Sequence, residues 1–151
     1  MELRRFDFED CIRESLLRNI PPSKEKAIGS MRVADKWLEE AEKGLKSQIF
    51  NSSILSSYLA MFHAARSMLF FDGFRERSHY CIARYLEEKY VKKKLLEDKW
   101  VELLDHYREL RHNSLYDISF FTSEDEAKTA LGTAKQFIDR MKILLEKRKN
   151  M

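Results

Sequence analysis

The residues whose types can do chemistry are concentrated in one stretch, DHYRELRHNSLYDI at 105–118. Within ten residues this stretch carries two guanidiniums, an imidazole, an amide, a phenol and a carboxylate, which belong to Arg108, Arg111, His112, Asn113, Tyr116 and Asp117. If these side chains converge, they form an anion-binding site with groups that can move protons, which is the chemistry needed to hold or cleave a phosphate ester. If they do not converge, they are the polar end of an ordinary helix.

Helical spacing decides which of these side chains can meet. Arg108, His112 and Tyr116 lie four residues apart and would form one stripe on an unbroken helix, whereas Arg111 would stand about 140° from Tyr116. We therefore expect Arg111 and Tyr116 to meet only if the helix ends or bends at residues 113–114, whose types favour a helix end.

Each candidate also has an ordinary structural explanation. Arg111 can pair with an acid of a neighbouring helix, and Tyr116 can anchor a core with its hydroxyl outward. For Asn113 we favour a helix C-cap. His112 can simply face solvent.

The four histidines give no metal signal. The spacing of His63, His79, His106 and His112 matches no zinc pattern, so we predict no metal site, and we expect no cofactor. His63 lies in an apolar stretch and is interpreted as a core histidine. His79 follows a predicted N-cap and is interpreted as a surface residue.

The elements that must position these residues are helical. The 151 residues fit one domain. Four glycines and two prolines are too few for the turns that many short strands would need. The charges are evenly mixed, with 28 Lys and Arg against 25 Asp and Glu, so the net charge of +3 argues neither for nor against nucleic acid. Glutamine is scarce beside abundant Lys and Glu, a bias that indicates a thermophilic source.

Apolar periodicity predicts four long helices, at 23–48, 51–71, 97–113 and from Thr122 or Ser123 to about residue 149, with shorter ones at 6–19 and 79–91. We see no strand pattern. The prediction is an all-α protein, an up-and-down four-helix bundle with additional short helices. Residues 1–22, set apart by Pro21 and Pro22, are an N-terminal helix or arm, and residues 23–151 are the bundle domain.

The sequence predicts further features of two of the long helices. The helix at 51–71 is apolar around much of its circumference, so we expect it to be central and to end at Asp72-Gly73. Its small residues would let another helix, or a second copy, approach closely; they are Ser56, Ala60, Ala64 and Ser67. The last helix has a predicted buried face made of Ala127, Ala130, Leu131, Ala134, Phe137, Ile138, Met141 and Leu145.

Cysteines and hydropathy predict the compartment. Cys11 and Cys81 are far apart with no CxxC pair, so we expect two buried or semi-buried thiols in a reducing cytosol. The first residues are too charged for a signal peptide, and no apolar run approaches the length that spans a bilayer. We therefore expect a cytoplasmic protein that does not engage a membrane.

Several segments, in this order, resemble the HEPN domain, in the branch of short proteins called UPF0332. The segment SYLAMFHAARSMLFFDG at 57–73 is similar to the family's YYAMFHAAKALL segment, and the pair Ser78-His79 resembles its KSH element. RHNSLYD at 111–117 resembles the RxxxxY-Asp signature, and the last helix with its EDEAKTAL opening also fits. The resemblance covers roughly residues 30–147.

This resemblance implies a helical bundle that dimerises so that two copies of the Arg motif line a shared cleft. In active family members an Rx4-6H motif cleaves RNA without a metal, with the His assisting proton transfer and the Arg steadying the phosphate. Many such proteins are toxins encoded beside a minimal nucleotidyltransferase antitoxin, to which they bind. Others resemble inactive binding modules.

The sequence departs from the catalytic pattern because Tyr116 stands where the motif has its His. A tyrosine of ordinary pKa, about 10, is a poor general base at neutral pH but can donate a hydrogen bond to a phosphate oxygen. We therefore expect a homodimer that binds RNA or a nucleotide and has weak or lost ribonuclease activity. The candidate catalytic residues are Arg111 and Tyr116, and the candidate binding residues are Arg108, Arg111, His112, Asn113 and Asp117. The alternative is a non-catalytic subunit that pairs with a minimal nucleotidyltransferase, with Tyr116 as the target of nucleotide attachment.

Overall fold

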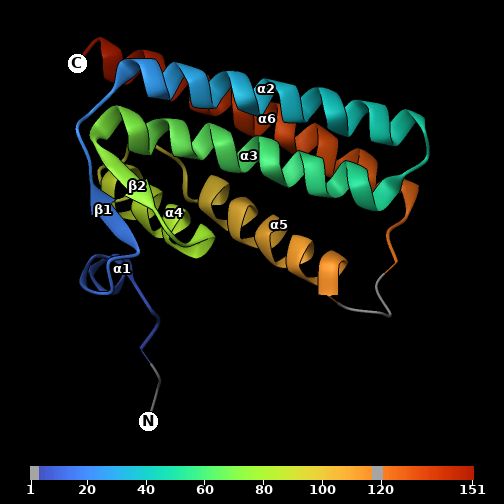
Figure 1. Cartoon of the computed structure of the whole chain (residues 1–151), viewed down its shortest axis with the longest axis horizontal. Helices are drawn as coiled ribbons and strands as arrows, with labels where there is room; N and C mark the ends of the chain where they lie inside the picture. The colour runs from blue at the N-terminus through green and yellow to red at the C-terminus, as the bar shows by residue number, and fades with distance from the viewer. Residues whose placement is uncertain (1–3, 117–120) are drawn as a thin grey trace.

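The computed structural model describes residues 4–116 and 121–151, and helices make up most of them (Figure 1). In chain order the elements are α1 (Phe8–Arg13), β1 (Leu17–Asn19), α2 (Lys24–Lys46), α3 (Phe50–Asp72), β2 (Phe74–Glu76), α4 (His79–Leu86), the π-helical turn η1 (Glu87–Val91), α5 (Asp98–Tyr116) and α6 (Glu124–Lys149). The predicted all-α class and the bundle of four long helices, α2, α3, α5 and α6, are confirmed.

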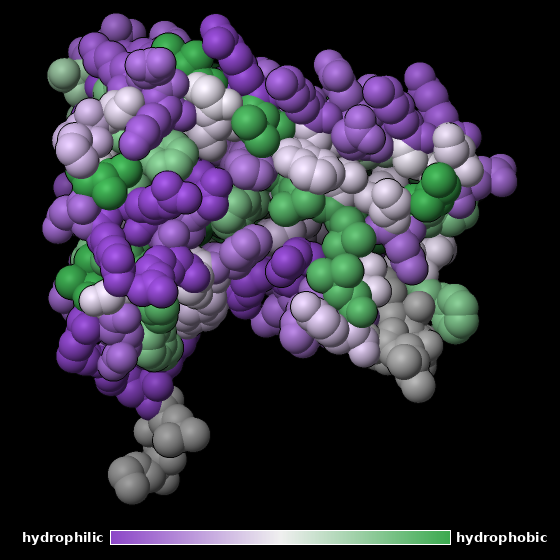
Figure 2. Space-filling view, viewed as in Figure 1, coloured by the Kyte–Doolittle hydropathy of each residue, from purple (hydrophilic) through white to green (hydrophobic). Residues whose placement is uncertain are grey.

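Helix α3 is the centre of the bundle, as its apolar sequence predicts. It packs against α2, α4, α5 and α6, and Figure 1 shows it running between α2 and α5. The expectation that no apolar run reaches membrane-spanning length fails for α3 on length and hydropathy alone. Two thirds of its apolar window, 67%, is nevertheless buried inside the protein, which is the burial of a core helix. In the view of Figure 2 the outer face is largely hydrophilic.

Small residues bring α2 and α3 together. The Ser53 hydroxyl donates to the carbonyl of Ala41 at 2.7 Å, and the Ser30 hydroxyl donates to the carbonyl of His63 at 2.7 Å. A Cβ at Gly44 would lie 3.2 Å from the Ser53 nitrogen, so the two backbones approach closely there. The predicted small residues of α3 are buried, namely Ser56, Ala60, Ala64 and Ser67.

Capping residues lie at three of the predicted helix limits. The Ser23 hydroxyl accepts from the Lys26 amide at 3.0 Å, and the Ser123 hydroxyl accepts from the Glu126 amide at 3.1 Å. Helix α3 ends at Gly73 in the left-handed conformation, with φ of 91°. A side chain at this glycine would also meet the Ile20 carbonyl at 2.8 Å, so the turn requires glycine.

The predicted helix at 6–19 and the absence of strands are both wrong. Helix α1 ends at Arg13, and Ser15 takes a φ of 58°, which turns the chain. The strands β1 and β2 then pair antiparallel, with Leu17 opposite Glu76 and Asn19 opposite Phe74. Three residues are too few to display the alternation that identifies a strand in sequence.

The prediction of two free thiols is also wrong, because Cys11 and Cys81 form a disulfide. Their Cα atoms lie 6.0 Å apart, and both residues are fully buried. Their separation of 70 positions gives no sequence signal of proximity. The bond forms because α1 packs on α4, a tertiary contact that periodicity does not report.

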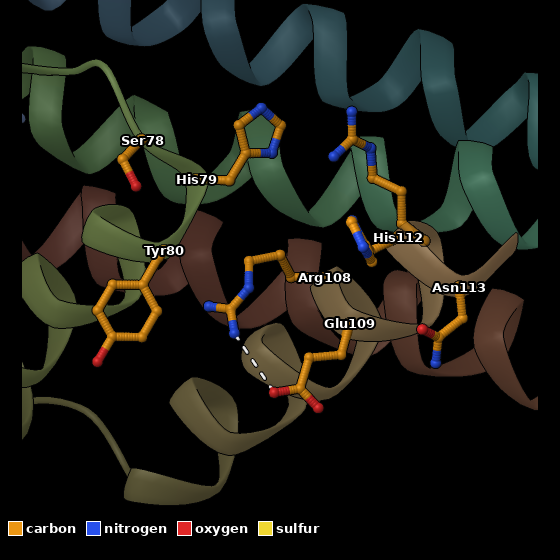
Figure 3. Close-up of a pocket in the computed structure, with 8 residues that line it drawn as sticks. Ser78, His79, Tyr80, Arg108, Glu109, His112 and Asn113 are labelled. Carbon is orange, nitrogen blue, oxygen red and sulfur yellow. Dashed lines mark ion pairs between the residues drawn. The ribbon is translucent and has the colours of Figure 1, made fainter. Parts of the chain in front are cut away.

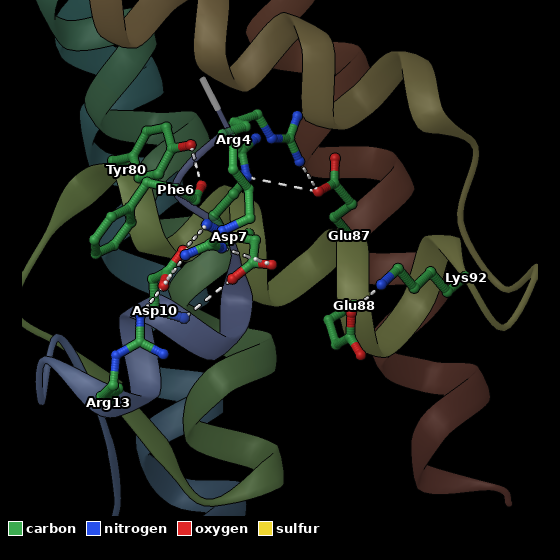
Figure 4. Close-up of polar contacts among 11 residues, drawn as sticks. Arg4, Phe6, Asp7, Asp10, Arg13, Tyr80, Glu87, Glu88 and Lys92 are labelled. Carbon is green, nitrogen blue, oxygen red and sulfur yellow. Dashed lines mark hydrogen bonds and ion pairs between the residues drawn. The ribbon is translucent and has the colours of Figure 1, made fainter. Parts of the chain in front are cut away.

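Polar contacts order the arm, residues 4–22, and join it to α4 and η1 (Figure 4). Arg4 donates twice to Asp10, at 2.7 and 2.9 Å, and Asp10 completes a capping box with Asp7 at the start of α1. Arg5 pairs with Glu87 across 82 positions of sequence. The hydrogen bond from Arg4 holds the pKa of the Asp10 carboxyl well below its usual range.

Candidate functional site

A pocket of about 460 Å³ lies between the start of α4 and the C-terminal half of α5 (Figure 3). Its lining residues are Ser78, His79 and Tyr80 at the start of α4 and Arg108, Glu109, Arg111, His112 and Asn113 on α5. The structure thus brings four of the predicted binding residues, those at 108, 111, 112 and 113, to one pocket. Asp117 lies outside the described residues.

Tyr116 does not join Arg111, because α5 continues without a break through residues 113–114 to Tyr116. Its side chain is not part of the pocket lining; the residue is 69% exposed, and its ring lies 4.9 Å from the His112 ring. Asn113 is an exposed residue within the helix, so its interpretation as a C-cap is wrong. Asn and Ser disfavour a helix by only a few tenths of a kcal/mol per residue, which the packed turns before them override.

Arg108 is held in place by the residues around it. It donates to Asp105 at 2.8 Å, and the second oxygen of Asp105 accepts from Arg84, which is 2% exposed. The Tyr80 ring contacts both guanidiniums, with its centroid 4.5 Å from the Arg84 carbon and 5.0 Å from the Arg108 carbon. One carboxylate therefore serves two cations, and Glu109 approaches Arg108 only at 3.6 Å.

Arg111 reaches across the pocket toward α3. Its guanidinium carbon lies 6.0 Å from the centre of the Tyr58 ring, within cation–π range. In the part of the chain that the structure describes, no carboxylate lies within ion-pair distance of Arg111. The pairing of Arg111 with an acid of a neighbouring helix is thus not seen among these residues.

His79 is a residue whose position sequence reasoning missed. Its Nδ1 lies 2.9 Å from the Tyr58 hydroxyl, and its ring stacks on Phe62 with centroids 4.1 Å apart and planes at 21°. The interpretation as a surface residue is therefore wrong. The available signal was the spacing of Tyr58 and Phe62, one turn apart on α3, which forms an aromatic face for a ring from another helix.

Burial makes His79 a neutral imidazole. It lowers the pKa of His79 to about 4, and the nearby cations, Arg111 first among them, lower it further in the same direction. Burial also raises the pKa of the Tyr58 hydroxyl, which keeps its proton at neutral pH. His63, predicted to be a core histidine, is half-buried with a pKa lowered to about 4 by the same cause.

The start of α4 adds positive potential to the pocket. Ser78 is the N-cap in an extended conformation, and its hydroxyl makes no capping hydrogen bond. The first backbone N–H groups of a helix lack intrahelical partners and carry the positive end of the helix dipole. With Arg108 and Arg111 opposite, the pocket favours an anion. Among residues 4–116 and 121–151, no group of three or more His, Cys, Asp or Glu is placed to hold a metal.

Comparison with known proteins gives consistent results. The family model described as HEPN domain matches residues 29–144. A protein of Archaeoglobus fulgidus named "UPF0332 protein" is 30% identical over 121 residues, which cover 78% of this chain and 93% of the relative. A protein of Methanocaldococcus jannaschii that carries the name "Putative toxin" is 22% identical over 116 residues, which cover 77% of this chain and 86% of the relative.

Proposed function

This chain belongs to the HEPN domain family, in its UPF0332 branch, and from that premise we propose that it binds a phosphate of RNA or of a nucleotide in the pocket between α4 and α5. The observation that carries the proposal is the convergence of Arg108, Arg111 and the start of α4 on one pocket. A phosphate oxygen accepts hydrogen bonds from guanidinium N–H groups and from the free amides of a helix N-terminus.

The remaining pocket residues fit the rest of a nucleotide. His112 and Asn113 are exposed on the pocket rim, where an imidazole and an amide can hydrogen-bond ribose hydroxyls or base edges. Tyr116, one turn beyond His112, offers an exposed aromatic face on which a base can stack. The expected Arg-x4-Tyr site is thereby divided, with Arg111 on the phosphate and Tyr116 beside the adjoining nucleoside.

The first experiment measures the affinity of a fluorescein-labelled oligoribonucleotide by anisotropy. Arg111→Ala should weaken binding at least tenfold and lower the salt dependence by about one counterion, because one phosphate contact is lost. Arg32→Ala on α2 is the matched control, since it removes the same charge from a groove between α2 and α6. Equal affinities of wild type and Arg111→Ala would contradict the proposal.

We further propose that the protein acts in the cytoplasm as a homodimer and as one component of a toxin–antitoxin pair. The toxin role is supported by the name of the M. jannaschii relative. The dimer is supported by two exposed apolar residues, Leu115 in the last turn of α5 at 48% and Phe121 shortly before α6 at 86%. Light scattering should report a dimer for wild type and a monomer for the double variant Leu115→Asp/Phe121→Asp, and a monomeric wild type would contradict the dimer.

A second candidate function is a non-catalytic subunit that pairs with a minimal nucleotidyltransferase. The observation that favours it is the exposure of Tyr116, a residue that is 69% exposed beside His112. Attachment of a nucleotide to its hydroxyl would block the pocket rim. Mass spectrometry after incubation with a minimal nucleotidyltransferase and ATP should then find a nucleotide on Tyr116, and an unmodified residue would contradict this role.

A further inference from the structure

A second pocket, of about 340 Å³, lies beyond the other end of α4 and shares no lining residue with the pocket between α4 and α5. Its lining comes from the end of α3, from β2, from the last turn of α4 with η1, and from the end of α6. Helices α3 and α6 end at the same end of the bundle (Figure 1), which brings Arg148 to Asp72. A concave site assembled from several elements is where small ligands bind in proteins.

The carboxylate of Asp72 organises this second pocket. One of its oxygens accepts from the hydroxyls of Tyr85 and Tyr90, at 2.7 and 2.5 Å, and the other accepts from Arg148 at 2.7 Å. Arg148 also donates to the Tyr90 hydroxyl at 3.3 Å. Because both oxygens of Asp72 are engaged by the protein itself, this carboxylate fixes two rings and a guanidinium and has little capacity left for a cation from solution.

The lysines of the second pocket are not matched by acids. Lys89 on η1 and Lys93, four residues later, both line it, and in the described part of the chain no ion pair involves either of them. The Lys89 ammonium is half-buried at the pocket, 5.7 Å from the centre of the Phe74 ring. With Arg148, the lining side chains carry three cations against the one carboxylate of Asp72, so the pocket favours an anion.

Much of the remaining lining is aromatic or aliphatic. The ring of Phe74 lies 5.0 Å from that of Tyr85, with planes at 51°, and Leu95 and Met151 add aliphatic surface. Burial, and then the charge and hydrogen bond of Asp72, raises the pKa of the Tyr85 hydroxyl, which keeps its proton at neutral pH. The second pocket is therefore suited to holding a ligand rather than to moving protons.

We propose that the second pocket binds a small aromatic anion, a molecule with one flat ring and one phosphate or carboxylate group. Lys89 and Lys93 bind the anionic group as point charges. Arg148 donates to the same group from Nη1, which makes no hydrogen bond to any described residue. The flat ring packs against Phe74. This site does not depend on the proposed phosphate site between α4 and α5.

Nuclear magnetic resonance of the isotope-labelled full chain tests the site with two probes, phenyl phosphate and benzoate, which share a ring and differ in the anion. The amide resonances of Tyr85, Lys89 and Tyr90 should shift and saturate with at least one probe, and the tighter probe identifies the preferred anionic group. Inorganic phosphate, which has no ring, and benzyl alcohol, which has no charge, should each bind at least about tenfold more weakly. If either of them binds as tightly as the aromatic anion, the inference is overturned.

Variants test the charges directly. Lys89→Met/Lys93→Met removes both ammoniums and keeps most of each aliphatic chain, so it should weaken the tighter probe at least about tenfold. Lys94→Met is the matched control, because it removes the same charge from an exposed neighbour outside the lining, and its affinity should stay within about twofold of wild type.

Three results would overturn the inference. They are no shift of these resonances with either probe, an unchanged affinity in the double variant, and an equal loss of affinity in the control. Shifts confined to Arg108, Arg111 and the start of α4 would also overturn it, since the anion would then bind only in the pocket between α4 and α5, and the proposed phosphate site would stand.

Discussion

In the arm, three arginines are bound by acids, whereas in the pocket between α4 and α5 one arginine, Arg111, forms no ion pair among the described residues. Arg4 and Arg13 both pair with Asp10, and Arg5 pairs with Glu87 (Figure 4). At the pocket, Asp105 accepts hydrogen bonds from both Arg84 and Arg108, and Glu109 lies 3.6 Å from Arg108. Among the described residues no ion pair involves Arg111. Both regions also contact Tyr80, whose hydroxyl donates to the Phe6 carbonyl of the arm.

This difference distinguishes charged residues that hold chain segments together from charged residues that can bind a ligand. A matched cation holds one chain segment against another and has little capacity left for a ligand. An unmatched cation near a helix N-terminus raises the local positive potential, and an anion must be supplied from outside to balance it. On this view, changes in the arm should alter stability and leave RNA affinity intact, whereas changes in the pocket should alter affinity.

The largest effect should come from the disulfide between the arm and α4. Closing a loop of 70 residues is worth about 4 kcal/mol by chain entropy, so Cys11→Ala/Cys81→Ala should lose roughly that much stability in urea titration. RNA affinity should change less than threefold, because the pocket residues stay on α4 and α5. As a control, a reductant should lower the stability of wild type by the same amount and leave the stability of the variant unchanged. A collapse of affinity in the folded variant would break the comparison.

The next effect should come from Asp105, the carboxylate shared by Arg84 and Arg108. Asp105→Ala removes the hydrogen-bonded charge partner of the Arg84 guanidinium, 2% exposed, and leaves only Glu87 at 3.7 Å, which should cost about 3 kcal/mol of unfolding free energy. Asp35→Ala, which removes an exposed partner of Lys142, should cost less than about 1 kcal/mol. Equal losses in the two variants would show that burial at Arg84 carries no energetic weight.

The smallest effect should be the response of the arm to acid. Arg4 lowers the pKa of Asp10 below its ordinary 3.8, so the folded state binds this proton less well than the unfolded state. The resulting stability is present above pH 3.8 and is lost as the pH falls below it. After correction for intrinsic exchange rates, hydrogen exchange in α1 of wild type should therefore become faster below about pH 4. In Asp10→Asn the corrected rate should not change with pH in this range.

Periodicity was sufficient for the long helices. All eight residues predicted for the buried face of α6 are buried, and α2 and α3 begin and end within a few residues of the predicted limits. These features repeat along the chain, so local sequence contains them. The end of α3 was also predictable from local sequence, because glycine readily adopts the left-handed conformation that Gly73 takes at the end of the helix.

The features that sequence did not reveal depend on contacts between distant segments. The disulfide joins residues 70 positions apart, and the pairing of β1 with β2 joins two three-residue strands. His79 is fixed by Tyr58 and Phe62, which lie on a different helix. Within α5, the spacing rule correctly stated that an unbroken helix would separate Arg111 from Tyr116. What it could not decide was whether the helix breaks, since Asn and Ser weaken a helix only slightly.

The central claim is that the pocket between α4 and α5 holds a phosphate. A crystal structure with a dinucleotide carrying a 2′-O-methyl group, which cannot be cleaved, tests it most directly. The account predicts the phosphate within hydrogen-bonding distance of Arg108, Arg111 and the first backbone amides of α4. A phosphate bound at the arginines of the arm, or no bound dinucleotide at a concentration that saturates binding in solution, would contradict it.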